Sequence, residues 1–138
     1  MIQVLFGVSS GVLAIVFTRL FRAERWWYAI GLLVLPGLYA LFAVLIGEWA
    51  IAGREMLYGM TYVIAGLILA LKDLRHSAMV TGGFWIMHGG FDLLHDRLYS
   101  NPGVPTWYPV WCCSVDVVVG AYLIWLSTKL PEGNLRKA

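Results

Sequence analysis

The sequence predicts an all-α membrane protein, in which five transmembrane helices form a compact bundle and a single domain over residues 1–138. Hydrophobic residues make up 60% of the chain and charged residues 13%, whereas soluble domains have about 45–50% and about 25%. The mean hydropathy of +0.75 also indicates a membrane protein. A soluble enzyme domain of this size cannot bury so much apolar surface. The net charge of +2 is too small for a nucleic-acid-binding surface, so no nucleic-acid partner is expected.

Five apolar segments have about the length that a spanning helix needs, which is roughly 20 residues. The first is uncharged as far as Arg19 and lacks the basic start and the cleavage site of a signal peptide, so we expect it to remain as an anchor. The second contains Pro36, and the third is short but free of charge. Short connections favour antiparallel neighbours. The predicted spans are residues 2–18, 27–47, 57–71, 78–99 and 109–128.

The basic residues are distributed unevenly between the two sides of this bundle. Most of the ten Lys and Arg residues fall in the first connection, the third connection and the tail, and only Arg54 and Arg97 fall in the other two connections. Because cytoplasmic loops carry an excess of Lys and Arg, we expect the N-terminus outside and the C-terminus in the cytoplasm. The alternation of connections rich and poor in basic residues also supports five spans, since it would be lost if segment 57–71 did not cross the membrane. The expected location is a bacterial inner membrane.

The fourth and fifth spans carry nearly all the ionisable residues that fall inside the predicted membrane. Such residues are costly in a bilayer and mark functional sites by default. His88, Asp92 and His95 are spaced by four and three residues, which places them along one helix face. Asp92 and Asp116 each lie about 10 Å from the outer end of their span. These groups are therefore expected to meet in the outer half of the bilayer, on the periplasmic side.

This cluster predicts a metal site. Imidazole and carboxylate groups form a first shell for zinc, iron or copper, and a divalent cation would offset the charge of two buried carboxylates. A metal-dependent enzyme acting on a lipidic substrate would use Asp92 or Asp116 as its base, whereas a metal-handling protein would need none. The predicted ligands are His88, Asp92, His95 and Asp116, with Asp96 and Cys113 as further candidates.

Two other functions fit the same residues. His and Asp side chains form proton or solute relays in transporters, although the first three spans show no matching polar line to the cytoplasmic side. The cluster could instead be structural and lock the fourth helix to the fifth, in a homo-oligomer or an accessory subunit of a larger membrane complex. The sequence contains neither a glycine-rich phosphate loop nor a CxxCH motif, so neither a nucleotide nor a covalently attached haem is expected.

A longer pattern surrounds the cluster, in which His-x3-Asp-x2-His is followed by Asn-Pro, Val-Pro and Cys-x2-Asp. Its residues are His88, Asp92, His95, Asn101, Pro102, Val104, Pro105, Cys113 and Asp116. Through them, residues 85–122 resemble an uncharacterised family of small bacterial integral membrane proteins, a domain of unknown function. In that family's pattern a second His follows the position of His95, where this chain has Asp96. The resemblance implies no activity, only that these residues form one constellation.

Overall fold

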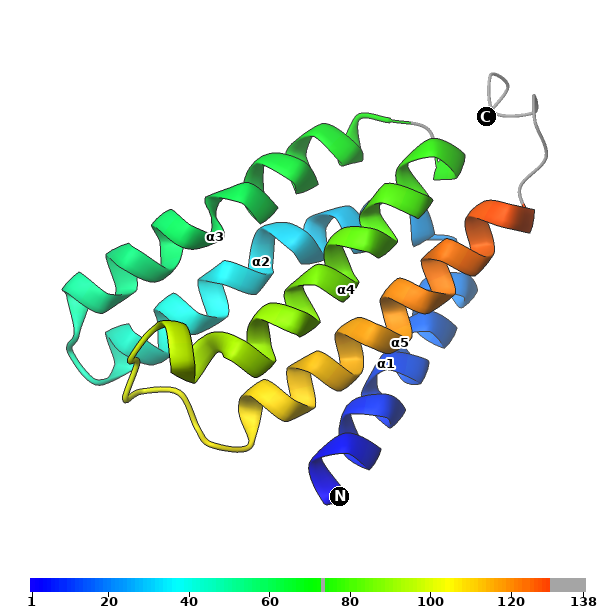
Figure 1. Cartoon of the computed structure of the whole chain (residues 1–138). Coiled ribbons are helices and arrows are strands. Elements are labelled where there is room, and N and C mark those ends of the chain that lie inside the picture. Colours follow the sequence, from blue (N-terminus) through cyan, green and yellow to red (C-terminus); the bar gives the residue numbers. More distant parts are fainter. Residues whose placement is uncertain (73, 130–138) are drawn as a thin grey trace.

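The structure is a computed structural model that describes residues 1–72 and 74–129 (Figure 1). Every regular element in these two ranges is a helix, which confirms the all-α prediction. The five helices are α1 (Ile2–Leu20), α2 (Glu24–Leu45), α3 (Trp49–Ala70), α4 (Leu74–Leu98) and α5 (Tyr108–Lys129).

The helices are arranged as two antiparallel hairpins with α1 added on one side (Figure 1). One hairpin is α2 with α3 and the other is α4 with α5, while α1 packs against α5. α1 runs parallel to α5, since Gly7 faces Trp111 and Gly11 faces Val118. The N-terminus and the α2–α3 and α4–α5 connections therefore lie at one end of the bundle. The α1–α2 connection and the end of α5 lie at the other end (Figure 1).

Four helices begin before the predicted spans, α5 by a single residue. Hydropathy marks only the apolar part of a helix, whereas the backbone ladder continues through polar turns. The largest difference is in α3, which begins at Trp49 and not near residue 57. Glu55, which the sequence placed in a connection, therefore lies inside α3 and is only 4% exposed. α3 therefore contributes a buried carboxylate that the sequence prediction placed outside the third span.

Two tight turns reverse the chain after α1 and α2. The backbone N–H of Ala23 donates to the carbonyl of Thr18 at 2.8 Å, and that of Glu48 donates to the carbonyl of Ala43 at 2.9 Å. Both are the six-to-one bonds of a Schellman motif, which needs a left-handed residue at its centre. That residue is Gly47, with φ of 81°, after α2, and Arg22, with φ of 52°, after α1. Glycine adopts this conformation at no steric cost, whereas arginine does not.

Glycines allow the helices of each hairpin to approach closely, as is common in membrane bundles. Gly59 of α3 lies against the ring of Pro36 in α2, and a Cβ at that position would overlap the ring. In the other hairpin, a Cβ on Gly82 would stand 2.7 Å from the carbonyl oxygen of Gly120. Gly83, next to Gly82, has open space around it. Only one of the two adjacent glycines therefore packs against α5.

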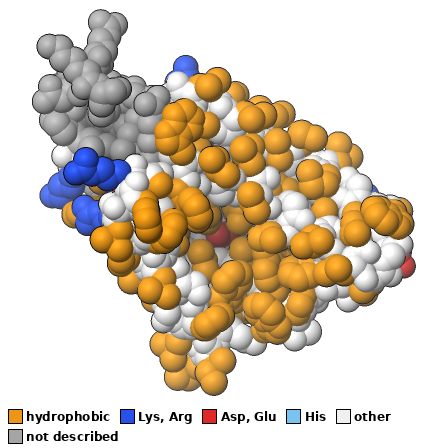
Figure 2. Space-filling view, turned by 180° about the vertical axis from the view of Figure 1, so that it is seen from behind, with side chains coloured by type: hydrophobic (Ala, Val, Ile, Leu, Met, Phe, Trp, Pro, Cys, Tyr) orange, Lys and Arg blue, Asp and Glu red, His pale blue; other side chains and the backbone are white. Residues whose placement is uncertain are grey.

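The outside of the bundle is apolar. Large exposed hydrophobic side chains occur on all five helices, and they cover most of the face shown in Figure 2. α1, residues Trp26–Leu45 of α2, and α5 are each long and apolar enough to cross a membrane. α3 and α4 have 22 and 25 residues, but their polar residues lower their hydropathy. The molecule is thus a helical protein with three helices of membrane-spanning character.

Replacing Gly59 with Ala should destabilise the protein, because the new methyl group must displace the Pro36 ring. Overpacking of this kind typically costs about 1–3 kcal/mol. Gly53 lies on the same helix and has open space at its Cβ position, so Gly53→Ala is the matched control and should not lower stability. Thermal unfolding in detergent measures both. Equal midpoints for the two variants would contradict the packing of α2 against α3.

Candidate metal centre

Four metal-ligating side chains converge in the interior of the α4–α5 hairpin. His88 and Asp92 come from α4, and Cys112 and Asp116 come from α5. One ligand atom from each lies within 4.8 Å of those from all the others. Each residue is at most 2% exposed. We call these four residues the α4–α5 group.

His88 is the centre of the polar contacts in this group. Its Nδ1 lies 2.7 Å from Asp116 Oδ2 and 3.6 Å from Asp92 Oδ1. A carboxylate only accepts hydrogen bonds, so a protonated Nδ1 donates to Asp116. The other oxygens, Asp92 Oδ2 and Asp116 Oδ1, are buried without a partner in the described part of the chain. Two carboxylates thus have acceptor capacity that the protein does not satisfy.

Helix geometry explains why these residues meet. α4 and α5 are antiparallel, so the middle of one helix faces the middle of the other. Gly89 allows the close approach, because a Cβ there would stand 3.2 Å from the Cβ of Asp116. His88 and Asp92 are four residues apart, as are Cys112 and Asp116, and this spacing places both members of each pair on one helix face.

A second polar group lies next to the first, towards the α4–α5 connection. His95 Nε2 lies 3.0 Å from Glu55 Oε1, and Asn101 Nδ2 donates to the same oxygen at 2.9 Å. Asn101 Nδ2 also donates to the backbone carbonyl of Tyr39 at 3.1 Å. The α4–α5 connection is therefore fastened to α2 and α3. We call His95, Glu55 and Asn101 the Glu55 group.

Tyr39 joins the two groups. Its hydroxyl donates to Asp92 Oδ1 at 2.7 Å, and its ring stacks on the His95 ring with centroids 4.2 Å apart. Tyr39 itself is 1% exposed. A single α2 side chain thus contacts one α4 residue from each polar group, which fixes α2 against α4.

The structure brings together three of the four predicted ligands, namely His88, Asp92 and Asp116. It does not bring His95 into the α4–α5 group, because two helical turns, about 10 Å of rise, separate it from His88. Asp96 also lies outside that group: its side chain is 76% exposed and lies 3.4 Å from His95.

Cys112, and not Cys113, completes the group. At about 100° per residue, Cys112 lies some 40° around the helix from Asp116, whereas Cys113 lies some 60° away on the other side. Both cysteines are free, and Cys113 is only half-buried. Of the two cysteines, only Cys113 is among the predicted candidate ligands, although the four-residue spacing of Cys112 from Asp116 is a usable signal.

Sequence reasoning also missed Glu55 and Tyr39. Glu55 is an acidic residue that would have been recognised if the start of α3 had been placed at Trp49. Tyr39 gave no signal, because a tyrosine in an apolar span is ordinary. Only the packing of α2 against α4 shows its role.

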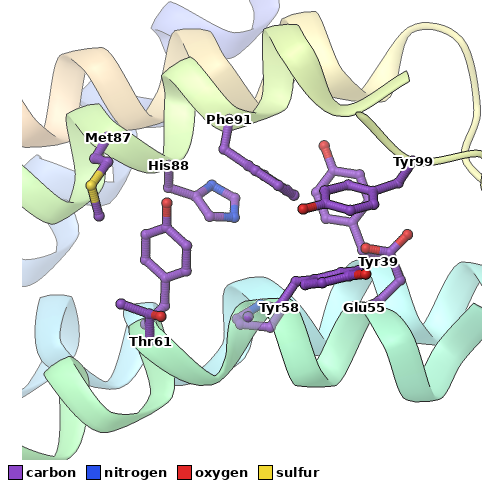
Figure 3. Close-up of a pocket in the computed structure, with 11 residues that line it drawn as sticks. Tyr39, Glu55, Tyr58, Thr61, Met87, His88, Phe91 and Tyr99 are labelled. Atoms are coloured by element: carbon purple, nitrogen blue, oxygen red, sulfur yellow. The ribbon is translucent and has the colours of Figure 1, made fainter. Parts of the chain in front are cut away.

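A cavity of about 230 Å³ lies between α2, α3 and α4. His88 projects into it from α4, with Phe91 and Met87 on the same helix and Tyr58 and Thr61 facing them from α3 (Figure 3). His88 is the only member of the α4–α5 group that lines this cavity. The cavity and the group therefore share one imidazole ring but are otherwise separate.

The comparisons with known proteins add nothing to this geometry. A scan against protein-family models, a search of curated proteins and a search of solved structures each found no match to the chain. The resemblance of residues 85–122 to a family of unknown function therefore stays a prediction.

Replacing Tyr39 with Phe should destabilise the fold, because the variant leaves Asp92 buried without its hydroxyl donor. An unsatisfied buried polar group costs about 1–3 kcal/mol, and more when it is charged. Tyr58→Phe is the control, since Tyr58 is 45% exposed at the cavity rim. Chemical denaturation in detergent compares the two. If Tyr39→Phe unfolded no earlier than Tyr58→Phe, the assigned bond to Asp92 would be wrong.

Proposed function

We propose that this protein is a five-span integral membrane protein that binds one divalent transition metal ion at His88, Asp92, Cys112 and Asp116. The observation that carries the proposal is the convergence of four donor atoms within 4.8 Å. The two buried carboxylate oxygens that lack partners support it. A cation between α4 and α5 would satisfy both oxygens and offset their charge.

The donor set suits particular metals. One imidazole nitrogen, one thiolate and two carboxylate oxygens favour zinc, and iron or copper are the alternatives, whereas calcium and magnesium prefer oxygen ligands alone. Binding requires Cys112 as the thiolate, so uptake of the metal would release protons.

The burial of the group favours a structural metal over a catalytic one. Structural zinc sites are closed by four protein ligands, whereas catalytic sites keep one position open for water or substrate. All four residues here are at most 2% exposed. We infer that the metal locks α4 to α5, so we assign the site no reaction, and Asp92 and Asp116 act as ligands and not as bases.

The proposed topology has all five helices crossing the membrane, with the N-terminus outside and the metal site in its outer half. The lengths of α3 and α4 support two further spans, since 22 and 25 residues extend over about 33 and 38 Å. Arg19 and Lys129 lie at one end of the bundle, the end that would be cytoplasmic.

Metal analysis of the purified chain tests the site. Wild type should hold about one equivalent of zinc, iron or copper after loading, and Asp116→Asn and His88→Gln should lower the content by about tenfold or more. Element analysis by mass spectrometry gives the stoichiometry. Absence of metal from the loaded wild type, or retention by both variants, would refute the proposal.

Three further substitutions sharpen this test. Cys112→Ser should weaken metal binding, whereas Cys113→Ser should not, although the two residues are adjacent. Asp96→Asn should also keep the metal, because that carboxylate is 76% exposed and lies outside the group. The opposite result for the cysteine pair would place the ligand on the other face of α5.

The topology predicts which residues a membrane-impermeant thiol reagent can reach in intact cells. Glu48→Cys and Ser100→Cys should be labelled from outside, and Lys72→Cys and Lys129→Cys only after lysis. All four positions are exposed, and the unmodified chain gives the baseline. Labelling of Lys72→Cys without lysis would show that α3 does not cross.

A further inference from the structure

The cavity between α2, α3 and α4 has a composition that the metal site does not explain. Four tyrosines and one phenylalanine line it, together with the buried carboxylate of Glu55, and among the described side chains no Lys or Arg lines it. Aromatic faces attract cations, and the attraction grows when the cation is desolvated. The aromatic residues are Tyr39, Tyr58, Tyr62, Phe91 and Tyr99.

Glu55 provides the charge of this cavity. The hydrogen bonds that it receives from His95 and Asn101 both end on Oε1. Neither bond uses Oε2, so the carboxylate keeps an acceptor for a further group. Because Glu55 is only 4% exposed, its field is weakly screened by solvent, and with a neutral His95 ring donating to Oε1 it favours a cation in the adjoining space.

An apolar groove continues from the cavity along the outside of α3 and α4. It has a volume of about 370 Å³ and shares Thr61 with the cavity. Ile64 and Ile68 of α3 and Val80 and Phe84 of α4 line it. The groove runs away from Glu55, which in the proposed topology means from the middle of the bilayer into its inner half.

We propose that the cavity and the groove together bind a single-chain amphiphile with an ammonium head group. The head group lies in the aromatic cavity and faces Glu55, and the chain lies in the groove. The proposal rests on the membrane placement proposed above but not on the metal. A phospholipid fits less well, because its phosphate lies between the amine and the chains. That phosphate would face Glu55 in a cavity whose described lining includes neither Lys nor Arg.

Titration calorimetry of the full chain in a neutral maltoside detergent tests this, with the heat of partition into empty micelles subtracted. Decyltrimethylammonium should bind saturably at one site, and decanol, its uncharged counterpart of equal chain length, should not. Glu55→Gln should weaken binding about tenfold or more. Tyr58→Leu should weaken it about threefold or more, and Tyr58→Phe, which keeps the ring face, should stay near wild type.

The controls separate this site from the metal site. Glu48→Gln removes an exposed carboxylate outside the cavity and should bind the probe like wild type. Tyr58 lies at the rim and outside both buried networks, so Tyr58→Leu should fold and keep its metal, which is measured in the same samples. Equal binding of decanol, full binding by Glu55→Gln and Tyr58→Leu, or equal displacement of the probe by decylphosphocholine would each overturn the proposal. Loss of metal alone would not overturn the proposal.

Discussion

The hydrogen bond between His88 and Asp116 is the interaction on which the rest of this bundle depends. It joins α4 to α5 at a point where the neighbouring carboxylate of Asp92 is also buried. Buried charges persist only when they are paired or coordinated, and one imidazole cannot satisfy two carboxylates. A cation at this point would balance the remaining negative charge of the two carboxylates. The antiparallel helices could then stay close along their whole length.

The two hairpins are held together by polar contacts as well as by packing. In a membrane, apolar side chains gain little by leaving lipid for a protein interface, so small residues and hydrogen bonds contribute more to helix association. Here Tyr39 bonds to Asp92 and stacks on His95, while Glu55 accepts from His95 and Asn101. These contacts set the position of α2 and α3 against α4, and they give the cavity its carboxylate and part of its aromatic wall.

The structure thus places two different environments on either side of the His88 ring. The α4–α5 group is closed and nearly inaccessible, as suits a metal that stabilises the fold. The cavity on the other side continues into an apolar groove on the outside of α3 and α4, as would suit the proposed amphiphile. Stability and ligand binding would then be served by neighbouring groups with few residues in common.

The sequence by itself determined the all-α class and the location of the main polar site. Its apolar runs mark helix interiors, and the spacing of His88, Asp92 and Asp116 places these residues at one level of one hairpin. Tertiary structure decided which other residues join them. His95 is paired with Glu55 of α3. The sequence did not reveal this pairing, because the start of α3 and its contact with α4 depend on packing between segments distant in sequence. Periodicity describes one helix at a time, so it could not reveal Tyr39, the Glu55 group or the cavity that lies between helices.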